Sequence, residues 1–331
     1  MKILVPGGGG FLGRFVARRM RRAGHDVTIL GRNSYPFMER EGFAAIKQDI
    51  CDRDGLIHSF KGFDEVHHTA SLTGISVTRE PFYRINVEGT RNVIEACLAN
   101  SIKKLIYTSS PSVVYGGHDQ EMVDETAPYP HRYLAHYPET KALAEREVLH
   151  ANKPGTLLTV SLRPHLIWGP EDTNLIPRLL DRARKGRLRI IGDGGNMADV
   201  TYVENVAQAH QLASEKLVDG SPVCGRAYFI TNGEPVKVWE FINNILLGVG
   251  MQPVTRTIPF RLAYLVGLGL ETLYSLLRLK GEPVMSRFLA SQLATDHCYA
   301  IEAARKDLSY EPEISVADGL KILLESLNNN G

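Results

Sequence analysis

MKILVPGGGGFLGRFVARRMRR, residues 1–22, places a short apolar run, a run of glycines and an amphipathic pattern in direct succession. Residues 2–5 are typical of a short buried strand. Behind the glycines, apolar side chains recur at helical spacing, at Leu12, Phe15, Val16 and Met20. A glycine turn alone is weak evidence, but strand, glycines and helix in this order are the context of a dinucleotide-binding fingerprint. We therefore predict a nucleotide site on a Rossmann-type sheet.

The glycines and the start of the helix have distinct expected roles. Gly7 can make a sharp turn, Gly10 lets the backbone approach a pyrophosphate, and Gly13 lets the helix pack closely on the strand. Phe11 and Leu12 begin the helix, whose free N–H groups and partial positive charge suit the same anion.

The bulk composition is that of an ordinary globular protein. The chain has 331 residues, 44% hydrophobic and 23% charged, which suits one large domain or two joined domains. Its net charge of +1 gives no reason to expect nucleic-acid binding. Its four cysteines are far apart, which argues against a zinc site and a disulfide scaffold. Because the sequence opens on a core strand, we expect no signal peptide and a cytoplasmic protein.

Further apolar runs alternate with helical patterns along the first half of the chain. A helix is expected over 83–99, and strands are expected at 25–30, 45–50, 65–71, 104–108 and 157–162. This alternation predicts an α/β fold with a doubly wound parallel sheet. His67 and His68 are neighbours in one expected strand and therefore lie on opposite faces, so we expect no metal site there.

The end of the second expected strand bears on cofactor choice. Sites that prefer NAD place Asp or Glu there, bonded to the ribose 2′-hydroxyl. Here Gly31 and Arg32 follow the strand, so no carboxylate repels a 2′-phosphate and a guanidinium can bind it. We predict NADP(H), against the alternative that Arg32 is only a solvated loop charge. Further cofactor contacts are expected after the third and fourth strands, from Asp49, Thr69, Ala70 and Ser71.

A tyrosine and a lysine four residues apart, Tyr137 and Lys141, are candidates for catalysis because they share one face of a helix. A phenol has a pKa of ~10 and becomes a useful acid–base group only when its anion is stabilised. An adjacent ammonium would lower the pKa of Tyr137 by electrostatic attraction. Ser110, after the fifth expected strand, can bond a substrate carbonyl; the alternative for this serine is ordinary turn chemistry.

Several motifs together carry a resemblance to a known family. They are GGGGFLG at 7–13, NVEGT at 86–90, YTSSPSV at 107–113, YPETK at 137–141, LRPHLIWGP at 162–170 and DVTYVENVAQAH at 199–210. In order and spacing they resemble the extended short-chain dehydrogenase/reductases, and within that group the 3β-hydroxysteroid dehydrogenase-like branch. The resemblance implies a Rossmann-type cofactor domain with a smaller, discontinuous C-terminal substrate-binding domain.

The resemblance also assigns roles to individual residues. Tyr137 would donate a proton, Lys141 would activate it, and Ser110 would anchor the substrate carbonyl. Anchoring the serine motif on Tyr115 instead would place Pro111, which has no hydroxyl, at the catalytic position. Cofactor contacts beyond those above are implied for Ile50, Asn86, Thr108, Tyr137, Lys141, Pro164 and His165.

The C-terminal half narrows the resemblance. GRAYFITNGEPV at 225–236, ETLYSLLRLKGEP at 271–283 and SRFLASQLATDHCY at 286–299 are similar to ketoreductases of bacterial long-chain olefin biosynthesis. This similarity implies NADPH-dependent reduction of the 3-keto group of a 2-alkyl-3-oxoalkanoate. The implied partners are the β-lactone synthetase and β-lactone decarboxylase of that pathway or a lipid surface, and a homo-oligomer is expected. The alternatives are a 3β-hydroxysteroid or carboxysterol dehydrogenase and a non-catalytic NADP-binding regulator.

The expected cofactor portion is 1–164 plus about 199–224, and the expected substrate portion is about 165–198 and 225–331. In the latter, the apolar stretch 259–279 is too interrupted by charges to span a bilayer. It is either a buried or substrate-lining helix or a surface that contacts a membrane or a partner. Candidate apolar pocket walls are Leu262, Tyr264, Leu265, Leu273, Leu276 and Phe288.

Overall fold

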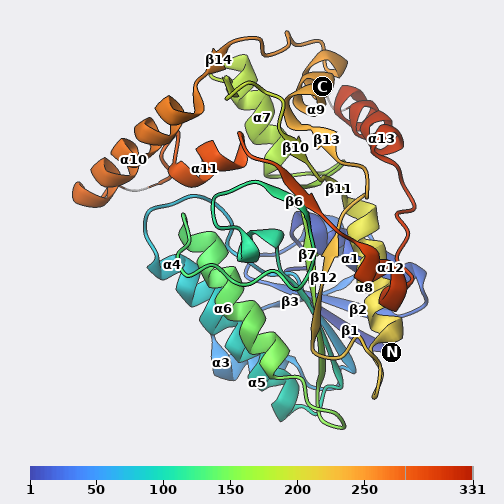
Figure 1. Cartoon of the computed structure of the whole chain (residues 1–331). Coiled ribbons are helices and arrows are strands. Elements are labelled where there is room, and N and C mark those ends of the chain that lie inside the picture. Colours follow the sequence, from blue (N-terminus) through green and yellow to red (C-terminus); the bar gives the residue numbers. More distant parts are fainter. Residues whose placement is uncertain (280, 330–331) are drawn as a thin grey trace.

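A seven-stranded sheet forms the centre of the computed structural model, which describes residues 1–279 and 281–329 (Figure 1). Its strand order is β12-β7-β5-β4-β1-β2-β3, and every neighbouring pair is parallel. The strands are β1 (Lys2–Pro6), β2 (Asp26–Gly31), β3 (Ala44–Lys47), β4 (Glu65–His68), β5 (Lys104–Thr108), β7 (Leu158–Pro164) and β12 (Arg226–Ile230). Parallel strands of this kind are buried on both faces, and β7 is buried along its whole length.

Helices cover both faces of this sheet, which confirms the predicted doubly wound fold. On one face lie α1 (Phe11–Arg22) and α8 (Val203–Lys216), and α2 (Pro36–Arg40) flanks the end of β2. On the other face lie α3 (Arg53–Ser59), α5 (Gly89–Ala99) and α6 (His136–His150). The helix expected over 83–99 is present but begins earlier and changes its winding, because α4 (Glu80–Phe82) leads into a π-helical segment (Tyr83–Glu88) that continues as α5.

The remaining elements form a second layer beyond the carboxyl ends of the strands (Figure 1). Its helices are α7 (Leu175–Arg184), α9 (Val238–Gly248), α10 (Phe260–Leu276), α11 (Arg287–Gln292) and α13 (Val316–Asn329). A small sheet has the order β13 (Val236–Lys237), β10 (Met197–Ala198), β15 (His297–Tyr299), β6 (Gln120–Val123). Two short pairs complete the layer: β8 (Ile167–Trp168) with β11 (Thr201–Tyr202), and β9 (Ile190–Ile191) with β14 (Thr257–Ile258).

Some segments lie across the boundary expected from the sequence. Residues 226–230, expected in the substrate portion, form β12 at the edge of the large sheet, because the buried run Tyr228–Ile230 pairs with β7. Residues 120–123, expected in the cofactor portion, instead form β6 and pair with β15. The helix α12 (Glu302–Leu308) also packs against the core of the large sheet. The two portions therefore alternate more often along the chain than in the boundaries expected from the sequence motifs.

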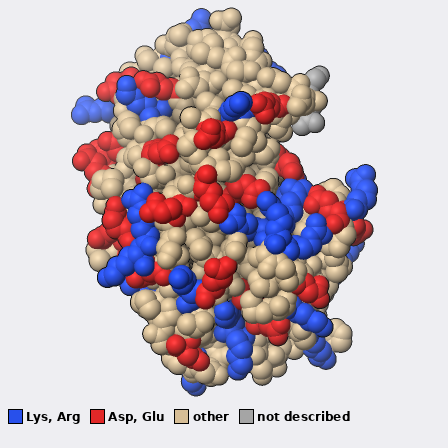
Figure 2. All heavy atoms as spheres, turned by 90° about the vertical axis from the view of Figure 1, so that its right-hand side faces the viewer, with Lys and Arg blue, Asp and Glu red and all other residues tan. Residues whose placement is uncertain are grey.

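Charges of both signs are interspersed on the face of the molecule in Figure 2, as expected for a net charge of +1. No helix in the described part of the chain is long and apolar enough to cross a membrane. The loops that follow β1, β4, β5 and β7 all lie at the carboxyl edge of the parallel sheet. Doubly wound sheets bind their ligands at this edge.

Candidate active site

The glycine loop after β1 is shaped by close backbone packing. Gly7 has a positive φ of 87°, and a Cβ atom added there would lie 2.5 Å from the backbone nitrogen of Ala70. A Cβ at Gly13 would collide with the carbonyl oxygen of Gly7, so only glycine lets α1 approach β1 this closely. A Cβ at Gly10 would meet only the Gly7 oxygen, 3.2 Å away, which leaves the outer side of the loop open. These contacts agree with the packing roles expected for Gly7 and Gly13.

The N-terminus of α1 has the properties of an anion site. No side chain caps it, and no acidic residue stands in its first turn. The backbone N–H groups of Phe11, Leu12 and Gly13 have no carbonyl oxygen four residues earlier in the helix to bond, so they remain available to a ligand. The open side of Gly10 and this uncapped helix end together fit a dinucleotide pyrophosphate.

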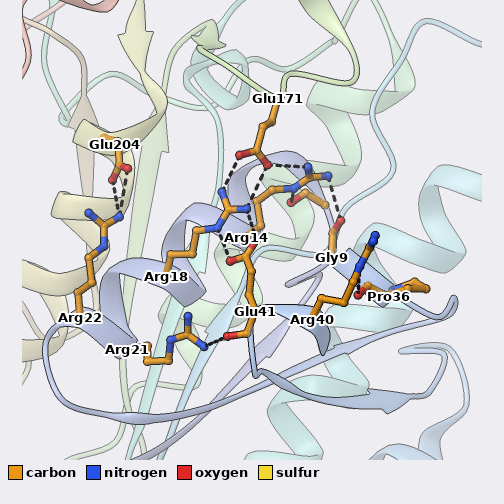
Figure 3. Close-up of polar contacts among 11 residues, drawn as sticks. Gly9, Arg14, Arg18, Arg21, Arg22, Pro36, Arg40, Glu41, Glu171 and Glu204 are labelled. Atoms are coloured by element: carbon orange, nitrogen blue, oxygen red, sulfur yellow. Dashed lines mark hydrogen bonds and ion pairs between the residues drawn. The ribbon is translucent and has the colours of Figure 1, made fainter. Parts of the chain in front are cut away.

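Arginines crowd the same helix, but carboxylates already neutralise most of them (Figure 3). Arg14 and Arg18 both bind Glu171, and Arg18 also binds Glu41 at 2.6 Å. These ion pairs keep the pKa of Glu171 below its ordinary value despite partial burial. Arg32 stands outside this cluster and is exposed. It is therefore a guanidinium at the end of β2 that a 2′-phosphate could bind.

Tyr35 lies near the cofactor loop and was not selected from the sequence. Its ring lies so close to Gly9 that a Cβ there would collide with it, and its hydroxyl covers Gly31 in the same way. Tyr35 therefore bridges the glycine loop and the end of β2. Glycines at these two positions allow that contact. No local sequence pattern connects Tyr35 with Gly9, because the two residues are far apart in the chain.

The other expected cofactor residues have mixed environments. The side chain of Ile50 is buried in the core below Gly89, so only its backbone can face a ligand. Asp49 accepts a hydrogen bond from the backbone N–H of Cys51 at 3.0 Å and so shapes its own turn. Thr69 donates to the carbonyl oxygen of Pro6 at 3.0 Å, which ties the loop after β4 to β1. The remaining residues of that loop, Ala70 and Ser71, are partly buried beside it.

Asn86 connects this loop to α6, the helix that carries Tyr137 and Lys141. It lies in the π-helical segment, where the irregular turn directs its buried amide inward. Its oxygen accepts from the backbone N–H of Leu72 at 2.7 Å, and its nitrogen donates to the Thr140 hydroxyl at 3.1 Å.

At the end of β7, after Pro164, the buried His165 donates from Nδ1 to the carbonyl oxygen of Asp199 at 2.7 Å. Asn86 and His165 thus both hold backbone segments in place around the carboxyl edge.

Ser110 closely follows β5 and Tyr137 lies in the first turn of α6, and the Ser110 hydroxyl is part of the electrostatic environment of Tyr137. The choice of Ser110 over Pro111 as the catalytic position stays a prediction. Burial raises the pKa of Tyr137, whereas a hydrogen bond with the Ser110 hydroxyl lowers it. Ser112 orients Ser110 by donating both its backbone N–H, at 3.2 Å, and its hydroxyl, at 2.9 Å, to the Ser110 oxygen. Pro111 is buried at the start of a 3-10 turn and has no hydroxyl to offer. Ser110 and Tyr137 therefore offer two hydroxyl groups as candidates for binding a carbonyl oxygen.

Lys141 lies one turn further along α6 but contacts different groups. Its ammonium donates to the Tyr107 hydroxyl and to the carbonyl oxygen of Thr108, both at 2.6 Å. Burial lowers the pKa of Lys141 to about 7. The expectation that this ammonium lowers the pKa of Tyr137 is wrong for this structure, because Lys141 is directed toward β5 and burial dominates at Tyr137. Tyr137 therefore keeps its proton at neutral pH, which suits an acid.

Glu145 continues the same face of α6 and was not selected from the sequence. It is fully buried and forms an ion pair with Arg163 of β7 at 2.7 Å. Ser161 and Tyr129 donate two further hydrogen bonds to its carboxylate. Burial alone would raise the pKa of Glu145, but Arg163 holds it below the ordinary value. This pair fixes α6 to the large sheet.

A pocket of about 540 Å³ opens beside the first turn of α6. One wall is made by α6 and the residues before it, including His136 and Glu139, and another by Leu268 and Leu276 of α10. Of the candidate apolar walls, only Leu276 lines this pocket. Leu262, Leu265 and Leu273 instead face solvent. Its full lining is Ile75, Ser76, Val77, Tyr133, Leu134, Ala135, His136, Glu139, Leu268, Glu271, Thr272, Ser275, Leu276, Ser286 and Arg287.

Comparison with known proteins agrees with this geometry. Residues 4–262 match the 3-beta hydroxysteroid dehydrogenase/isomerase family. The chain belongs to this family. Its members are oxidoreductases that act on hydroxyl and keto groups. In this chain, Ser110, Tyr137 and Lys141 lie at the carboxyl edge of the sheet. Doubly wound sheets bind their ligands at this edge.

Similar proteins cover nearly the whole chain. A 2-alkyl-3-oxoalkanoate reductase of Stenotrophomonas maltophilia is 46% identical over 98% of this chain and 99% of its own. The mouse sterol-4-alpha-carboxylate 3-dehydrogenase, decarboxylating, is 35% identical over 99% of this chain and 91% of its own. The UDP-glucose 4-epimerase of Thermus thermophilus, solved with NAD, covers 100% of both chains with a TM-score of 0.77 and 22% identity. That last likeness supports the fold alone.

Proposed function

We propose that this protein reduces the 3-keto group of a 2-alkyl-3-oxoalkanoate to a hydroxyl group, with NADPH as the reductant. The observation that carries the proposal is the position of Ser110 and Tyr137 at the carboxyl edge of the sheet, with Tyr137 next in the chain to His136, which lines a pocket that also contains Leu268 and Leu276 of α10. Full-length similarity to a reductase named for that substrate supports it. The uncapped start of α1 and the exposed Arg32 support a phosphorylated dinucleotide.

The site residues divide the work of the reduction. When bound along the glycine loop, NADPH supplies a hydride to the keto carbon. The hydroxyls of Ser110 and Tyr137 hold the keto oxygen, and Tyr137 transfers its proton to that oxygen as charge develops there. Lys141 holds the Tyr107 hydroxyl and the carbonyl oxygen of Thr108, and so supports the end of β5 next to the hydroxyls of Ser110 and Tyr137. The product carries one added hydride and one added proton.

A substrate panel tests the proposed function directly. The purified protein is mixed with NADPH and a 2-alkyl-3-oxoalkanoate, a 3-ketosteroid or a UDP-sugar, and nicotinamide oxidation is followed. Turnover of the keto acid well above that of the other two supports the proposal. Preference for the steroid would favour the second candidate, a sterol dehydrogenase, which the 35% identical mouse relative brings forward. If none of the three substrates is turned over although NADPH binds, the result would favour a non-catalytic NADP-binding regulator.

Replacing Arg32 with Ala should weaken NADPH binding about 10- to 100-fold, because a charge-assisted hydrogen bond is worth ~1.5–3 kcal/mol. NADH has no 2′-phosphate, so its dissociation constant should change little. The matched control is Arg40→Ala, which removes the same charge from an exposed site on α2, where Arg40 bonds the Pro36 oxygen. Cofactor titrations by fluorescence measure both constants. Equal losses for NADPH and NADH would remove Arg32 from the 2′-phosphate site.

The helix α10 supports a substrate with long alkyl chains. The solvent face of α10 carries a continuous apolar stripe, because Leu262, Leu265, Val266, Leu273 and Leu276 recur at helical spacing and are all exposed. A buried core helix would not present this face to water. Arg261 and Arg278 lie exposed at its two ends. We propose that α10 rests on an anionic lipid surface, from which the substrate enters the neighbouring pocket.

Serine at Leu265, Leu268 and Leu276 should weaken association with anionic phospholipid vesicles and reduce turnover of long-chain more than short-chain substrates. All three side chains are at least 40% exposed, so melting temperature and NADPH binding should stay near normal. The matched control replaces three exposed apolar residues elsewhere, Leu98, Val218 and Leu247, with serine. Co-sedimentation and a chain-length series measure the effects. Wild-type binding to a β-lactone synthetase but not to vesicles would replace the lipid with a protein partner.

A further inference from the structure

A chain of buried polar side chains lies between the large sheet and α8, away from the pocket. Glu65 and His67 project from the same face of β4, and the Glu65 carboxylate lies 2.6 Å from Nε2 of His67. Nδ1 of His67 lies 3.0 Å from Nδ1 of His210 on α8, and Nε2 of His210 lies 2.9 Å from the Thr108 hydroxyl. We call these four residues the histidine chain. Its first three members are completely buried.

The histidine chain ends at the catalytic lysine. Thr108 is the last residue of β5, and its side chain faces α8 while its carbonyl oxygen accepts a hydrogen bond from Lys141 on the opposite face. The other end of the chain is closed by Lys104, which lies 3.9 Å from Glu65 and donates to the carbonyl oxygen of Ser214. One connected set of contacts thus runs from the amino edge of the sheet to its carboxyl edge.

The hydrogen bonds of the histidine chain can all be satisfied in one direction. Burial holds the pKa of His210 well below its ordinary value, so its neutral ring donates at one nitrogen and accepts at the other. When Nε2 of His67 donates to Glu65, its Nδ1 accepts from Nδ1 of His210. Nε2 of His210 then accepts the hydroxyl proton of Thr108, which fixes that side chain. Burying a carboxylate and two imidazoles here is unfavourable compared with an apolar core.

We propose that the histidine chain positions the catalytic lysine: by fixing Thr108, it holds the carbonyl oxygen on which the Lys141 ammonium rests. His67 and His210 touch neither substrate nor cofactor in this proposal, and both act as positioning residues. The proposal rests on the oxidoreductase activity of the site and not on which ketone it reduces. It predicts that replacing His67 or His210, on the face of the sheet that α8 covers, lowers kcat.

The test compares His210→Phe, Thr108→Val and the double variant. Phenylalanine keeps the ring and removes both hydrogen bonds, and valine keeps the shape of threonine. We expect each single change to lower kcat about tenfold, and the double variant to be no slower than Thr108→Val, because both break the same chain. The NADPH dissociation constant of His210→Phe should stay within about twofold. His210→Gln, whose amide oxygen can still accept from Thr108, should recover part of kcat.

A control separates positioning from stability. Gln208→Leu removes another buried polar contact of α8, the hydrogen bond to the Glu311 carbonyl oxygen, without touching the histidine chain. It should lower the melting temperature and leave kcat unchanged. An unchanged kcat for His210→Phe, or losses that add in the double variant, would overturn the proposal. If His210→Phe does not fold, His67→Phe and Thr108→Val must both lower kcat for the proposal to stand.

The assay distinguishes this inference from the proposed function. Wild-type turnover is measured first with the 2-alkyl-3-oxoalkanoate and NADPH. If the wild type does not reduce it, the proposed function fails, and the variants are compared with the 3-ketosteroid instead. If the wild type reduces the keto acid and His210→Phe does so equally fast, the positioning role fails and the proposed function stands.

Discussion

Replacing Tyr137 with Phe is expected to lower kcat about 10²- to 10⁴-fold, the usual contribution of a positioned acid. The ring and its packing remain, but no hydroxyl is left to donate a proton to the keto oxygen. NADPH binding should survive, because the glycine loop and Arg32 are unchanged. Steady-state kinetics and a cofactor titration measure the two effects separately.

Ser110→Ala is the companion variant. In the proposed mechanism Ser110 holds the carbonyl oxygen without giving up a proton, so replacing Ser110 should lower kcat less than replacing Tyr137. Ser112→Ala keeps the nucleotide site and the acid but removes one of the groups that orient Ser110 at 2.9 Å. A Tyr137→Phe variant with near-normal turnover would remove Tyr137 from the mechanism, whatever the effect of the serines.

Local patterns were enough to predict the fold and the helix on which Tyr137 and Lys141 lie. The order of strand, glycines and helix in residues 1–22 predicts a parallel sheet that binds ligands at its carboxyl edge. The observed β1, α1 and β2 lie close to the expected residue ranges. The four-residue spacing of Tyr137 and Lys141 placed both on α6. These predictions succeeded because each depends on backbone geometry within one or two turns.

Contacts between distant segments could not be predicted in this way. Tyr35 packs on Gly9, and Lys141 is directed toward Tyr107, because of how β2 and β5 lie in three dimensions. The histidine chain joins β4 and β5 to His210 of α8, which lies more than a hundred residues further along the sequence. A sequence pattern can show that such side chains are polar, but not that they meet.

Arg163→Met is expected to lower the free energy of unfolding by about 3–5 kcal/mol, because it leaves the Glu145 carboxylate buried without its partner. The matched control is Arg91→Met, which removes the exposed partner of Glu147, two residues further along α6. That change should cost less than about 1 kcal/mol. Urea denaturation of both variants measures the difference.

The pH dependence identifies the cause of the loss. In the wild type, Arg163 keeps the pKa of Glu145 below its unfolded value, so the pair contributes stability that is lost as pH falls through the folded pKa. In Arg163→Met, only the hydrogen bonds from Ser161 and Tyr129 still oppose burial, and we expect burial to raise the folded pKa of Glu145 above the unfolded value. The variant is therefore penalised most at neutral pH, and the gap to the wild type should narrow as pH falls and Glu145 is protonated in both. Glu145→Met combined with Arg163→Met should recover stability at neutral pH, because no buried charge remains. A gap that stays constant with pH would attribute the loss to packing around the Arg163 side chain and not to the stranded carboxylate.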